Sequence, residues 1–257
     1  MVKFILLASY ILILGCSRAP DEMIFIPSGE FIMGSDRVDT EGQSAEFGSM
    51  KPWFADEHPQ RKVNLATFYI DRHEVTNANF AEFVRGTQTP APPFWQDRRP
   101  PPGQELFPVT QITWSEANAF CKWAGKRLPT EAEWEKAARG TDGREYVWGN
   151  DYKSGLANTG DAPNKKLMQV GSYPMSKSPY GVEDMVGNVW EWTSDWYQTY
   201  PGSDYRSDAF GVKFKVIRGN SWGELGHYTL THYSRAAYRF YAPPEFRLSD
   251  VGLRCAK

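Results

Sequence analysis

The half of the chain after Gly140 constrains the fold most strongly. It is rich in Gly, Asn, Pro and Trp, which are typical of short strands separated by turns. Aromatic residues make up 15% of the 257 residues and include 10 Trp, so a core can form from large side chains rather than from long regular elements. We therefore predict an irregular α+β single domain, with short strands and a few short helices.

The first half contains clearer strand and loop patterns. Residues 23–34 resemble two short strands around a Pro-Ser-Gly turn, and residues 63–70 resemble a further strand. Residues 36–60 are polar and are predicted to form a loop. Residues 86–108 hold many prolines and predict a surface excursion.

Capping residues predict three short helices in this half. Ser, Thr, Asp or Asn at the start of a helix accepts a backbone N–H, and a Glu three residues later completes a capping box. The helices are expected to begin at Thr76 or Asn77, at Thr113 and at Thr130, and to end near Arg85, before Gly125 and before Gly140. The side chains expected to face the core are Phe80, Phe83, Val84, Phe120, Trp123, Trp134 and Ala138.

The N-terminus has the pattern of a bacterial lipoprotein signal peptide. Lys3 precedes an apolar stretch over residues 4–14, which is too short for a membrane span, and Ile13-Leu14-Gly15-Cys16 looks like a lipobox. We expect a signal peptide over residues 1–15, lipidation of Cys16, a tether over 16–22 and a domain over 23–257. The alternative is ordinary secretory cleavage nearby, which removes Cys16. Lipidation predicts a location in the bacterial cell envelope, lipid-anchored in the periplasm and at the outer membrane.

The charge distribution excludes one class of partner. The formal net charge is −2, and no run of Lys or Arg forms a stripe. Proteins that bind nucleic acid need a basic surface to neutralise phosphates. We therefore expect no nucleic-acid binding.

Cysteine is scarce. Without Cys16 the chain contains only Cys121 and Cys255. Two cysteines in an exported chain suggest one disulfide, and the alternative is a pair of free redox thiols.

Several motifs occur in a fixed order along the chain and together resemble one family. They are residues 26–34 (IPSGEFIMG), 71–77 (DRHEVTN), 125–135 (GKRLPTEAEWE), 147–149 (VWG), 187–196 (GNVWEWTSDW), 216–222 (VIRGNSW) and 251–255 (VGLRC). The ordered set resembles the formylglycine-generating enzyme family, also called sulfatase-modifying factors, across residues 23–257. The resemblance implies that family's variant of the C-type lectin fold. It also implies a structural disulfide between Cys121 and Cys255.

The resemblance implies a structural calcium ion at the turn around Gly187. Its ligands would be the Asp184 side chain, the Gly187 and Val189 carbonyls and the Glu191 carboxylate. Calcium prefers six to eight oxygen ligands, and carboxylates flanking a bent Gly-Asn turn can supply several of them. The alternative is that Glu191 only caps or forms a salt bridge.

A second and weaker calcium site is implied at Asn158, Thr159 and the Tyr173 carbonyl. The family's aspartate aligns here with Gly171, which removes the only full negative charge from the ligand set. Asp161 is a candidate to compensate for this loss.

The catalytic cysteines of the family are missing. In the catalytic members a cysteine pair holds copper and oxidises a substrate cysteine; the matching positions are approximately Glu224 and Leu230. A thiolate is the nucleophile and copper ligand in that chemistry, so ordinary formylglycine generation is not expected.

The segment that replaces the cysteines contains Glu224, His227 and His232, which are the candidates for a transition-metal or acid–base site. The alternative is that these residues line a groove or face water. Arg218 is interpreted as a structural ion-pair partner. The residues expected along the groove are Trp222, Tyr228, Tyr233, Arg235 and Arg239, of which the two arginines could pair structurally or grip an anionic ligand.

The leading functional hypothesis is therefore a non-catalytic binding or accessory/maturation factor for a periplasmic or surface protein. Its partner would be a peptide segment of an exported protein or a small ligand. The alternative is an oxidoreductase with altered, cysteine-independent chemistry, in which a transition metal would be a cofactor. Sugar binding in the manner of C-type lectins is a third class, but the calcium-binding Glu-Pro-Asn-type tripeptide is absent.

Overall fold

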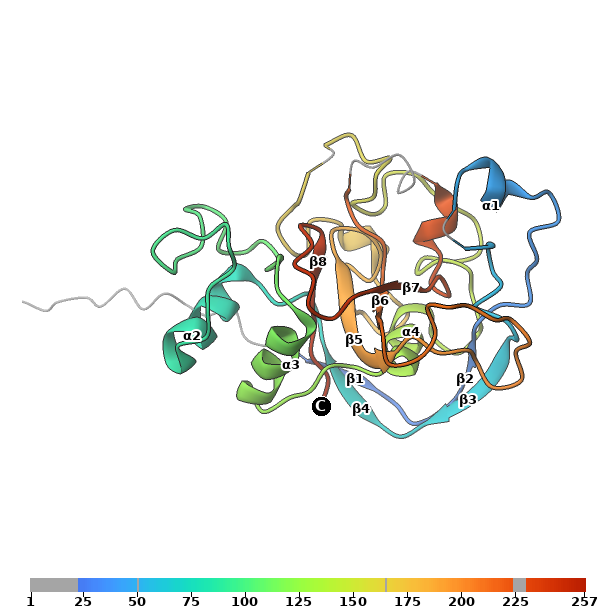
Figure 1. The fold of residues 1–257 in the computed structure, drawn as a ribbon, viewed down its shortest axis with the longest axis horizontal. Coiled ribbons are helices and arrows are strands. Elements are labelled where there is room, and N and C mark those ends of the chain that lie inside the picture. Colours follow the sequence, from blue (N-terminus) through green and yellow to red (C-terminus); the bar gives the residue numbers. More distant parts are fainter. Residues whose placement is uncertain (1–22, 50, 165, 224–229) are drawn as a thin grey trace, which may run out of the picture.

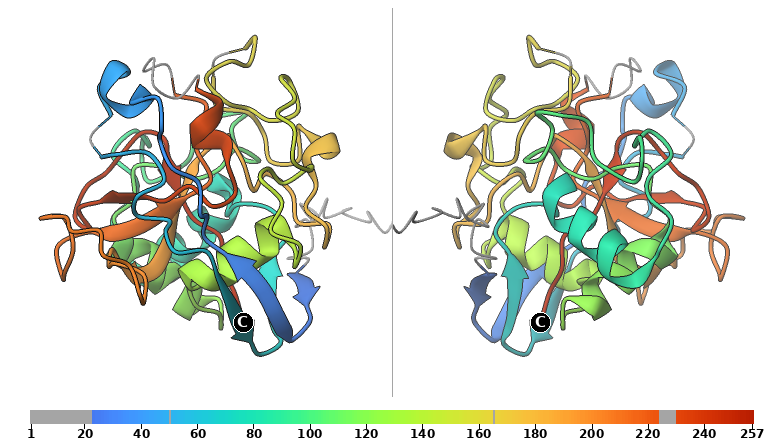
Figure 2. Two further views of the ribbon diagram at one scale, coloured as in Figure 1. Left: turned by 90° about the vertical axis from the view of Figure 1, so that its right-hand side faces the viewer. Right: turned by 90° about the vertical axis from the view of Figure 1, so that its left-hand side faces the viewer.

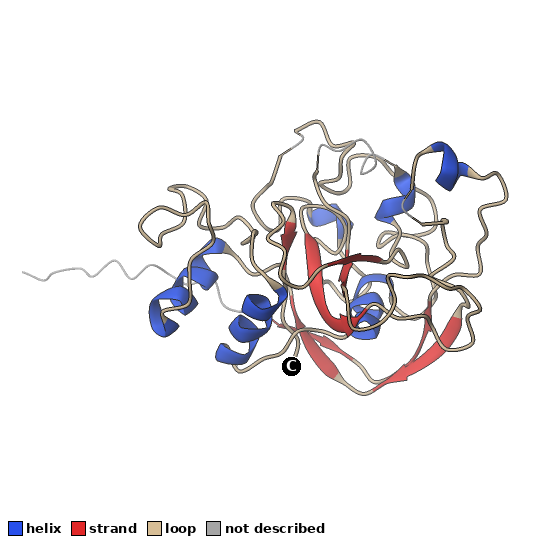
Figure 3. Ribbon diagram, viewed as in Figure 1, coloured by secondary structure: helices blue, strands red, loops and turns tan. Residues whose placement is uncertain are grey.

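The computed structural model describes residues 23–49, 51–164, 166–223 and 230–257. Short strands and short helices are connected by long loops (Figure 3). The prediction of an irregular α+β domain is confirmed.

The regular elements are short throughout the described residues. The helices are α1 (Gln43–Glu46), α2 (Asn77–Thr87), α3 (Trp114–Trp123) and α4 (Glu131–Arg139), with 3-10 turns η1 (Pro174–Ser176) and η3 (Thr231–Ser234). The strands are β1 (Met23–Ile26), β2 (Gly29–Met33), β3 (Arg61–Leu65), β4 (Phe68–Asp71), β5 (Trp190–Trp196), β6 (Lys215–Arg218), β7 (Phe240–Ala242) and β8 (Val251–Gly252). In the described part of the chain, no helix has the length and apolar character needed to span a membrane.

A four-stranded sheet in the order β7-β6-β5-β8 lies at the centre of the molecule (Figure 1). Strand β5 is antiparallel to β6 and parallel to β8, so that Glu191 lies opposite both Arg218 and Gly252. Two separate ribbons, β1-β4 and β2-β3, lie below α4 in Figures 1 and 2. Segments far apart in the sequence therefore meet around Glu191.

The predicted strand over residues 63–70 is two strands. β3 pairs with β2 and β4 pairs with β1, and Ala66 and Thr67 separate them. The partner strands are themselves separated by Pro27 and Ser28, so a continuous strand could not follow both. The prediction of one strand was wrong for this reason.

The predicted loop over residues 36–60 contains one helical turn, α1. The Asp39 carboxylate accepts the backbone N–H groups of Gln43 and Ser44, at 2.9 and 2.8 Å. An acidic side chain that satisfies free N–H groups stabilises a helix start. The sequence interpretation missed this local capping.

Both predicted capping boxes are present, and the predicted cap Thr76 forms a third box. They pair Thr76 with Asn79, Thr113 with Glu116 and Thr130 with Glu133. Each such cap contributes roughly 1 kcal/mol to helix stability. Helix α2 continues past Gly86 because Gln88, rather than the glycine, adopts the left-handed conformation at its C-terminus.

Tryptophans dominate the core, as the composition indicates. Trp134, Trp190 and Trp192 are each at most 1% exposed. Trp123, which we expected in the core, is 41% exposed. It is the last residue of α3 and packs against Phe83 only at the edge of the core, with ring centroids 5.7 Å apart.

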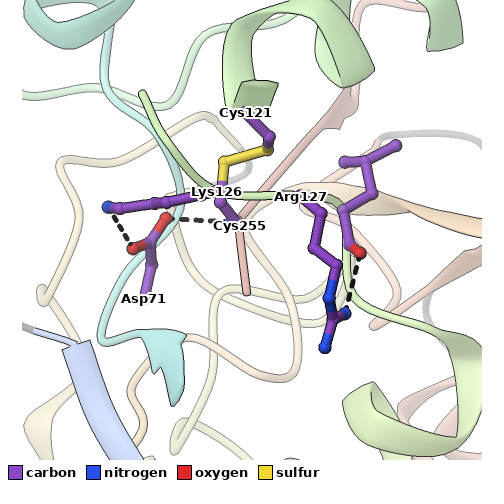
Figure 4. The surroundings of a disulfide bond; sticks show 6 residues. Asp71, Cys121, Lys126, Arg127 and Cys255 are labelled. Carbon is purple, nitrogen blue, oxygen red and sulfur yellow. Dashed lines mark hydrogen bonds and ion pairs between the residues drawn. A yellow bond between two sulfur atoms is a disulfide. The ribbon is translucent and has the colours of Figure 1, made fainter. Parts of the chain in front are cut away.

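The structure joins Cys121 of α3 to Cys255 near the C-terminus, as the resemblance implies (Figure 4). The two residues are 134 positions apart in the sequence. Asp71 accepts the Cys255 backbone N–H at 2.8 Å and pairs with Lys126 at 2.7 Å. The C-terminal segment is thus attached to both α3 and the end of β4.

Candidate functional site

Buried ion pairs hold the end of β6, which leads into the turn that carries Trp222. Arg218 at the end of β6 is fully buried and contacts Glu131 and Glu135 of α4, at 2.9 and 2.7 Å. Its guanidinium also donates to the Ala236 carbonyl at 2.7 Å. The interpretation of Arg218 as a structural residue is confirmed.

Arg235 and Arg239 are also structural, which corrects the expectation that they line a groove and could grip an anionic ligand. Arg235 is 3% exposed and pairs with Glu57 and Glu145, whereas Arg239 is 1% exposed and pairs with Glu131. Charged side chains in the interior need such partners because they lose their hydration. Sequence alone could not identify these partners, since they lie 90 or more positions away.

The turn after β6 positions Trp222. Asn220 has φ 64° and donates from its side chain to the Ser234 hydroxyl at 3.2 Å. The Ser221 hydroxyl donates to Asp250 at 2.9 Å, and the Trp222 backbone N–H donates to the Asn188 carbonyl at 3.2 Å. Trp222 is half-buried, and its indole N–H has no partner among the described residues.

His232 lies in an aromatic box. Its ring stacks on Trp53, with centroids 4.3 Å apart and an interplanar angle of 12°. Phe54 and Tyr238 contact it edge-on, with centroids 4.8 and 5.1 Å away. Tyr233 packs beside it and is only 7% exposed, so this tyrosine belongs to the interior rather than to an open groove.

The imidazole of His232 is held neutral. Burial, followed by the positive charges of Arg235 and Lys51, lowers its pKa far below the ordinary value of 6.5. Neither ring nitrogen has a hydrogen-bond partner among the described residues. A neutral imidazole with a free lone pair can accept a hydrogen bond or ligate a metal, but it is no acid at neutral pH.

Glu224, His227 and Tyr228 lie outside the described residues. The metal or acid–base site suggested for Glu224, His227 and His232 therefore stays a prediction. Within residues 23–49, 51–164, 166–223 and 230–257, no three His, Cys, Asp or Glu side chains lie together in a way that could hold a metal ion.

The Glu191 carboxylate belongs to an arginine, which corrects its expected role as a calcium ligand. Arg254 donates to both Glu191 oxygens at 2.7 Å, and the Trp134 indole N–H donates to one of them at 2.7 Å. Glu191 is fully buried, and each of its oxygens accepts at least one of these hydrogen bonds. The salt-bridge alternative describes Glu191.

Asp184 lies in a different environment, beside Glu74. Asp184 accepts the Gly171 backbone N–H, and Glu74 accepts the Asn188 side-chain amide at 3.0 Å with one oxygen. The other Glu74 oxygen, Oε2, is buried and receives no donor from the described residues, and the Glu74 and Asp184 side chains are themselves within hydrogen-bond reach of each other. Burial, reinforced by the charge of Asp184, raises the pKa of Glu74 well above 4.5.

These residues fit a hard cation. A buried carboxylate oxygen without a donor, a second carboxylate and a bent turn resemble the oxygen sites that calcium prefers. The bend requires Gly187, which has φ 83° and whose added Cβ would lie 2.5 Å from the Asn158 carbonyl oxygen. The sequence interpretation missed Glu74, although an acid three residues after the end of β4 was a usable signal.

The second proposed ligand set is only partly committed to other bonds. The Asn158 side-chain N–H group donates to Asn188 at 3.1 Å, but its Oδ1 atom is buried without a partner in the described residues, whereas the Thr159 hydroxyl donates to Asp161. The Tyr173 carbonyl accepts from Ser176 at 3.0 Å. Asp161 also accepts from two further hydroxyl groups, so its carboxylate stabilises a local loop instead of replacing the missing acid at Gly171.

Comparison with known proteins extends these observations. The family model described as "Sulfatase-modifying factor enzyme 1-like domain" matches residues 15–257. Inactive C-alpha-formylglycine-generating enzyme 2 of Mus musculus is 32% identical, over 95% of this chain and 87% of that protein. Formylglycine-generating enzyme of Streptomyces coelicolor is also 32% identical, over 93% of this chain and 90% of that protein. The structure of PvdO from Pseudomonas aeruginosa superposes with a TM-score of 0.67 at 27% identity, and covers 91% of this chain and 93% of PvdO.

Proposed function

The chain belongs to the sulfatase-modifying factor enzyme 1-like domain family, and on that premise we propose that it is a non-catalytic member. It acts as a binding or accessory/maturation factor for a periplasmic or surface protein. Its ligand is a peptide segment of an exported protein, or a small molecule, held near Trp222.

The cysteine inventory carries this proposal. The chain has three cysteines, and Cys121 and Cys255 are bonded to each other. The third, Cys16, precedes the domain and is the expected lipidation site. A thiol nucleophile is therefore missing from the segment in which the catalytic members have theirs. Relatives named as inactive and as formylglycine-generating enzyme are both 32% identical, so the cysteine inventory rather than the overall similarity supports this proposal.

Peptide binding without turnover tests the proposal. Cysteine-containing peptides and their serine analogues are incubated with the protein and copper, followed by mass spectrometry and calorimetry. We expect measurable binding of some peptides, no loss of thiol and weaker binding by Trp222→Ala. Trp123→Ala is the matched control because its exposed indole lies on α3. Oxidation of a peptide cysteine would overturn the proposal.

We also propose a structural calcium ion at the turn around Gly187, with Asp184, Glu74 and backbone carbonyls as ligands. Calcium would neutralise the two buried carboxylates and stiffen the turn that leads into β5. The unpartnered Glu74 oxygen supports this proposal.

Calcium addition to chelator-treated protein should raise its melting temperature. The increase should disappear in Asp184→Asn and remain in Glu245→Gln, which changes an exposed carboxylate. Elemental analysis should give about one calcium per chain. A melting temperature independent of calcium, together with no bound calcium, would exclude the site.

We further propose that the protein is lipid-anchored through Cys16 in the bacterial envelope, in the periplasm and at the outer membrane. The pattern of residues 1–16 supports this location. Mass spectrometry of the mature N-terminus should find acyl chains on Cys16, and Cys16→Ser should release the protein from membranes. An unmodified N-terminus downstream of Cys16 would instead indicate ordinary secretion.

An oxidoreductase with altered, cysteine-independent chemistry is the second candidate, and His232 favours it. A buried, neutral imidazole with both nitrogens unpartnered among the described residues is unusual in a purely structural role. Stoichiometric copper, iron or zinc that disappears in His227→Ala and His232→Ala would support this candidate. Full retention of metal in both variants, or its absence from the wild type, would contradict it.

A further inference from the structure

A pocket of about 460 Å³ lies between β2-β3, the start of α4 and the loop after β5. We call it the β3–β5 pocket. Its lining includes Met33, Arg61, Asp195, Trp196, Tyr200 and Pro201. In Figure 1 the β2-β3 ribbon lies along the lower edge of the molecule, whereas η3, in orange-red, lies in the upper part. Neither Trp222 nor His232 lines the pocket, which is therefore a different site.

Arg61 supplies a positive charge that forms no ion pair within the described residues. Its Nη2 group contacts only the Met33 sulfur, at 3.4 Å, which is a weak acceptor. Its Nε–H is buried without a partner in the described residues. The guanidinium carbon lies 4.6 Å from the centre of the Tyr200 ring, which holds the side chain in place. Arg61 thus has guanidinium N–H groups that lack a strong acceptor and are arranged in the way that binds carboxylates.

Asp195 supplies the opposite charge, also without an ion pair among the described residues. Its Oδ2 atom accepts the Glu131 backbone N–H at 2.8 Å and the Ser194 hydroxyl at 3.0 Å. These two bonds fix the carboxylate, while Oδ1 receives no hydrogen bond from the described residues. Burial and the charge of Glu131 raise the pKa of Asp195, whereas the charge of Arg239 lowers it.

The other charged groups near the pocket have contacts of their own, although the charge of Lys215 also interacts with Asp195. Glu131 and Arg239 pair with each other, at 2.6 Å. The ammonium group of Lys215 donates to the Ser194 carbonyl at 2.7 Å and lies 3.9 Å from the centre of the Trp196 ring. The pocket therefore presents one cation and one anion that remain available, between walls of thioether and aromatic groups.

We propose that the β3–β5 pocket binds a small zwitterion, a free α-amino acid, with its carboxylate on Arg61 and its ammonium group on Asp195. The side chain of the amino acid packs against Met33 and Trp196. The volume lies within the range of small-molecule sites and exceeds what an amino acid needs, so ordered water fills the rest. An anionic ligand alone would leave Asp195 without an ion-pair partner, and a cationic ligand alone would leave Arg61 without one.

Calorimetric titration of the full-length protein with L-leucine tests the proposal. Two derivatives each remove one charge: N-acetyl-L-leucine lacks the ammonium group, and L-leucinamide lacks the carboxylate. We expect saturable binding of L-leucine at one site and about tenfold or weaker binding of each derivative. Lack of saturation up to about 10 mM, or equal affinity for all three compounds, would overturn the proposal.

Two variants locate the bound molecule. Arg61→Met removes the charge but keeps an unbranched side chain against Tyr200, and Asp195→Asn keeps an oxygen for the Glu131 N–H. Each should weaken L-leucine binding about tenfold or more. Lys62→Met is the control, because its side chain is 73% exposed on the same strand. Unchanged affinity in folded Arg61→Met would place the ligand elsewhere and refute the assignment.

Discussion

Two regions of the molecule differ in how their buried carboxylates are neutralised. One is the cluster between β6 and α4, and the other is the turn around Gly187. In the first region, each oxygen of Glu131 and Glu135 receives at least one donor, from arginines or from the Gly34 backbone. In the second, Glu74 and Asp184 are as deeply buried, but one Glu74 oxygen has no donor among the described residues.

This difference distinguishes the α4 cluster, which belongs to the scaffold, from the turn around Gly187, where we propose a calcium site. A buried charge that lacks a partner destabilises a fold, whereas a matched cluster is self-sufficient. The carboxylates of the cluster on α4 need no further cation, although the Arg218 Nε–H is buried without a partner in the described residues. The turn at Gly187 is short of positive charge, which is why we propose calcium there and why its stability should depend on the solution. Removing a charge should therefore have opposite effects in the two regions.

The largest effect is expected for Arg218→Met. This change leaves Glu135 and Glu131 with less compensation in a fully buried place, and it should cost about 3–5 kcal/mol of the free energy of unfolding. Urea denaturation followed by tryptophan fluorescence measures the loss. Arg206→Met, at an exposed arginine, should change stability by less than about 0.5 kcal/mol. A cost below about 1 kcal/mol for Arg218→Met would mean that the cluster does not stabilise the scaffold.

Removal of the disulfide should cause the second largest loss of the free energy of unfolding. The double variant Cys121→Ala/Cys255→Ala should lose about 2–5 kcal/mol because its unfolded chain is no longer constrained across 134 positions. The bond also holds Arg254, next to Cys255, against Glu191. Chemical denaturation with and without reductant measures the effect. Reductant should destabilise the wild type and leave the double variant unchanged; insensitivity of both would contradict the expected role.

Local features of this molecule could be predicted from the sequence, and long-range pairings could not. The boxes at Thr113 and Thr130 specify helix starts because both partners lie within four residues. The division between β3 and β4 depends instead on which strands they pair with, and those partners lie about 30 or more positions earlier.

The candidate site shows the same limit. Arg235, Arg239 and Glu191 were assigned to a groove or a metal because sequence gives the residue type, but their actual partners come from distant segments. The ligand set at the turn around Gly187 came from the family resemblance, whereas the cysteine count already suggested one disulfide and the resemblance added support for it. Glu74 lay in a recognised motif, but its role emerges only when the fold brings it beside Asp184.

Glu74→Gln should have the opposite sign to Arg218→Met. The raised pKa of Glu74 means that its contribution is most favourable below about pH 4.5 and is lost as pH rises toward the folded pKa. In chelator-treated protein at neutral pH, the neutral glutamine should therefore stabilise the fold, by about 1 kcal/mol. Thermal unfolding of both proteins, with and without calcium, measures this. Destabilisation of the metal-free variant would remove the distinction between the two regions.

The smallest effect is expected at His232, whose two ring nitrogens also lack partners among the described residues. Its folded pKa is lowered below 6.5, so the unfolded chain binds an additional proton as pH falls. Stability should therefore decrease below about pH 6.5, by about 1 kcal/mol between pH 7.5 and 5.5 from this group. His232→Phe keeps the stacking on Trp53 and removes the titration, so its stability should depend less on pH over this range.

Urea denaturation at several pH values gives the comparison, with His58→Phe as the control because His58 is exposed beside Asp36. Parallel pH profiles for the wild type and His232→Phe would show that the aromatic box does not hold a neutral imidazole.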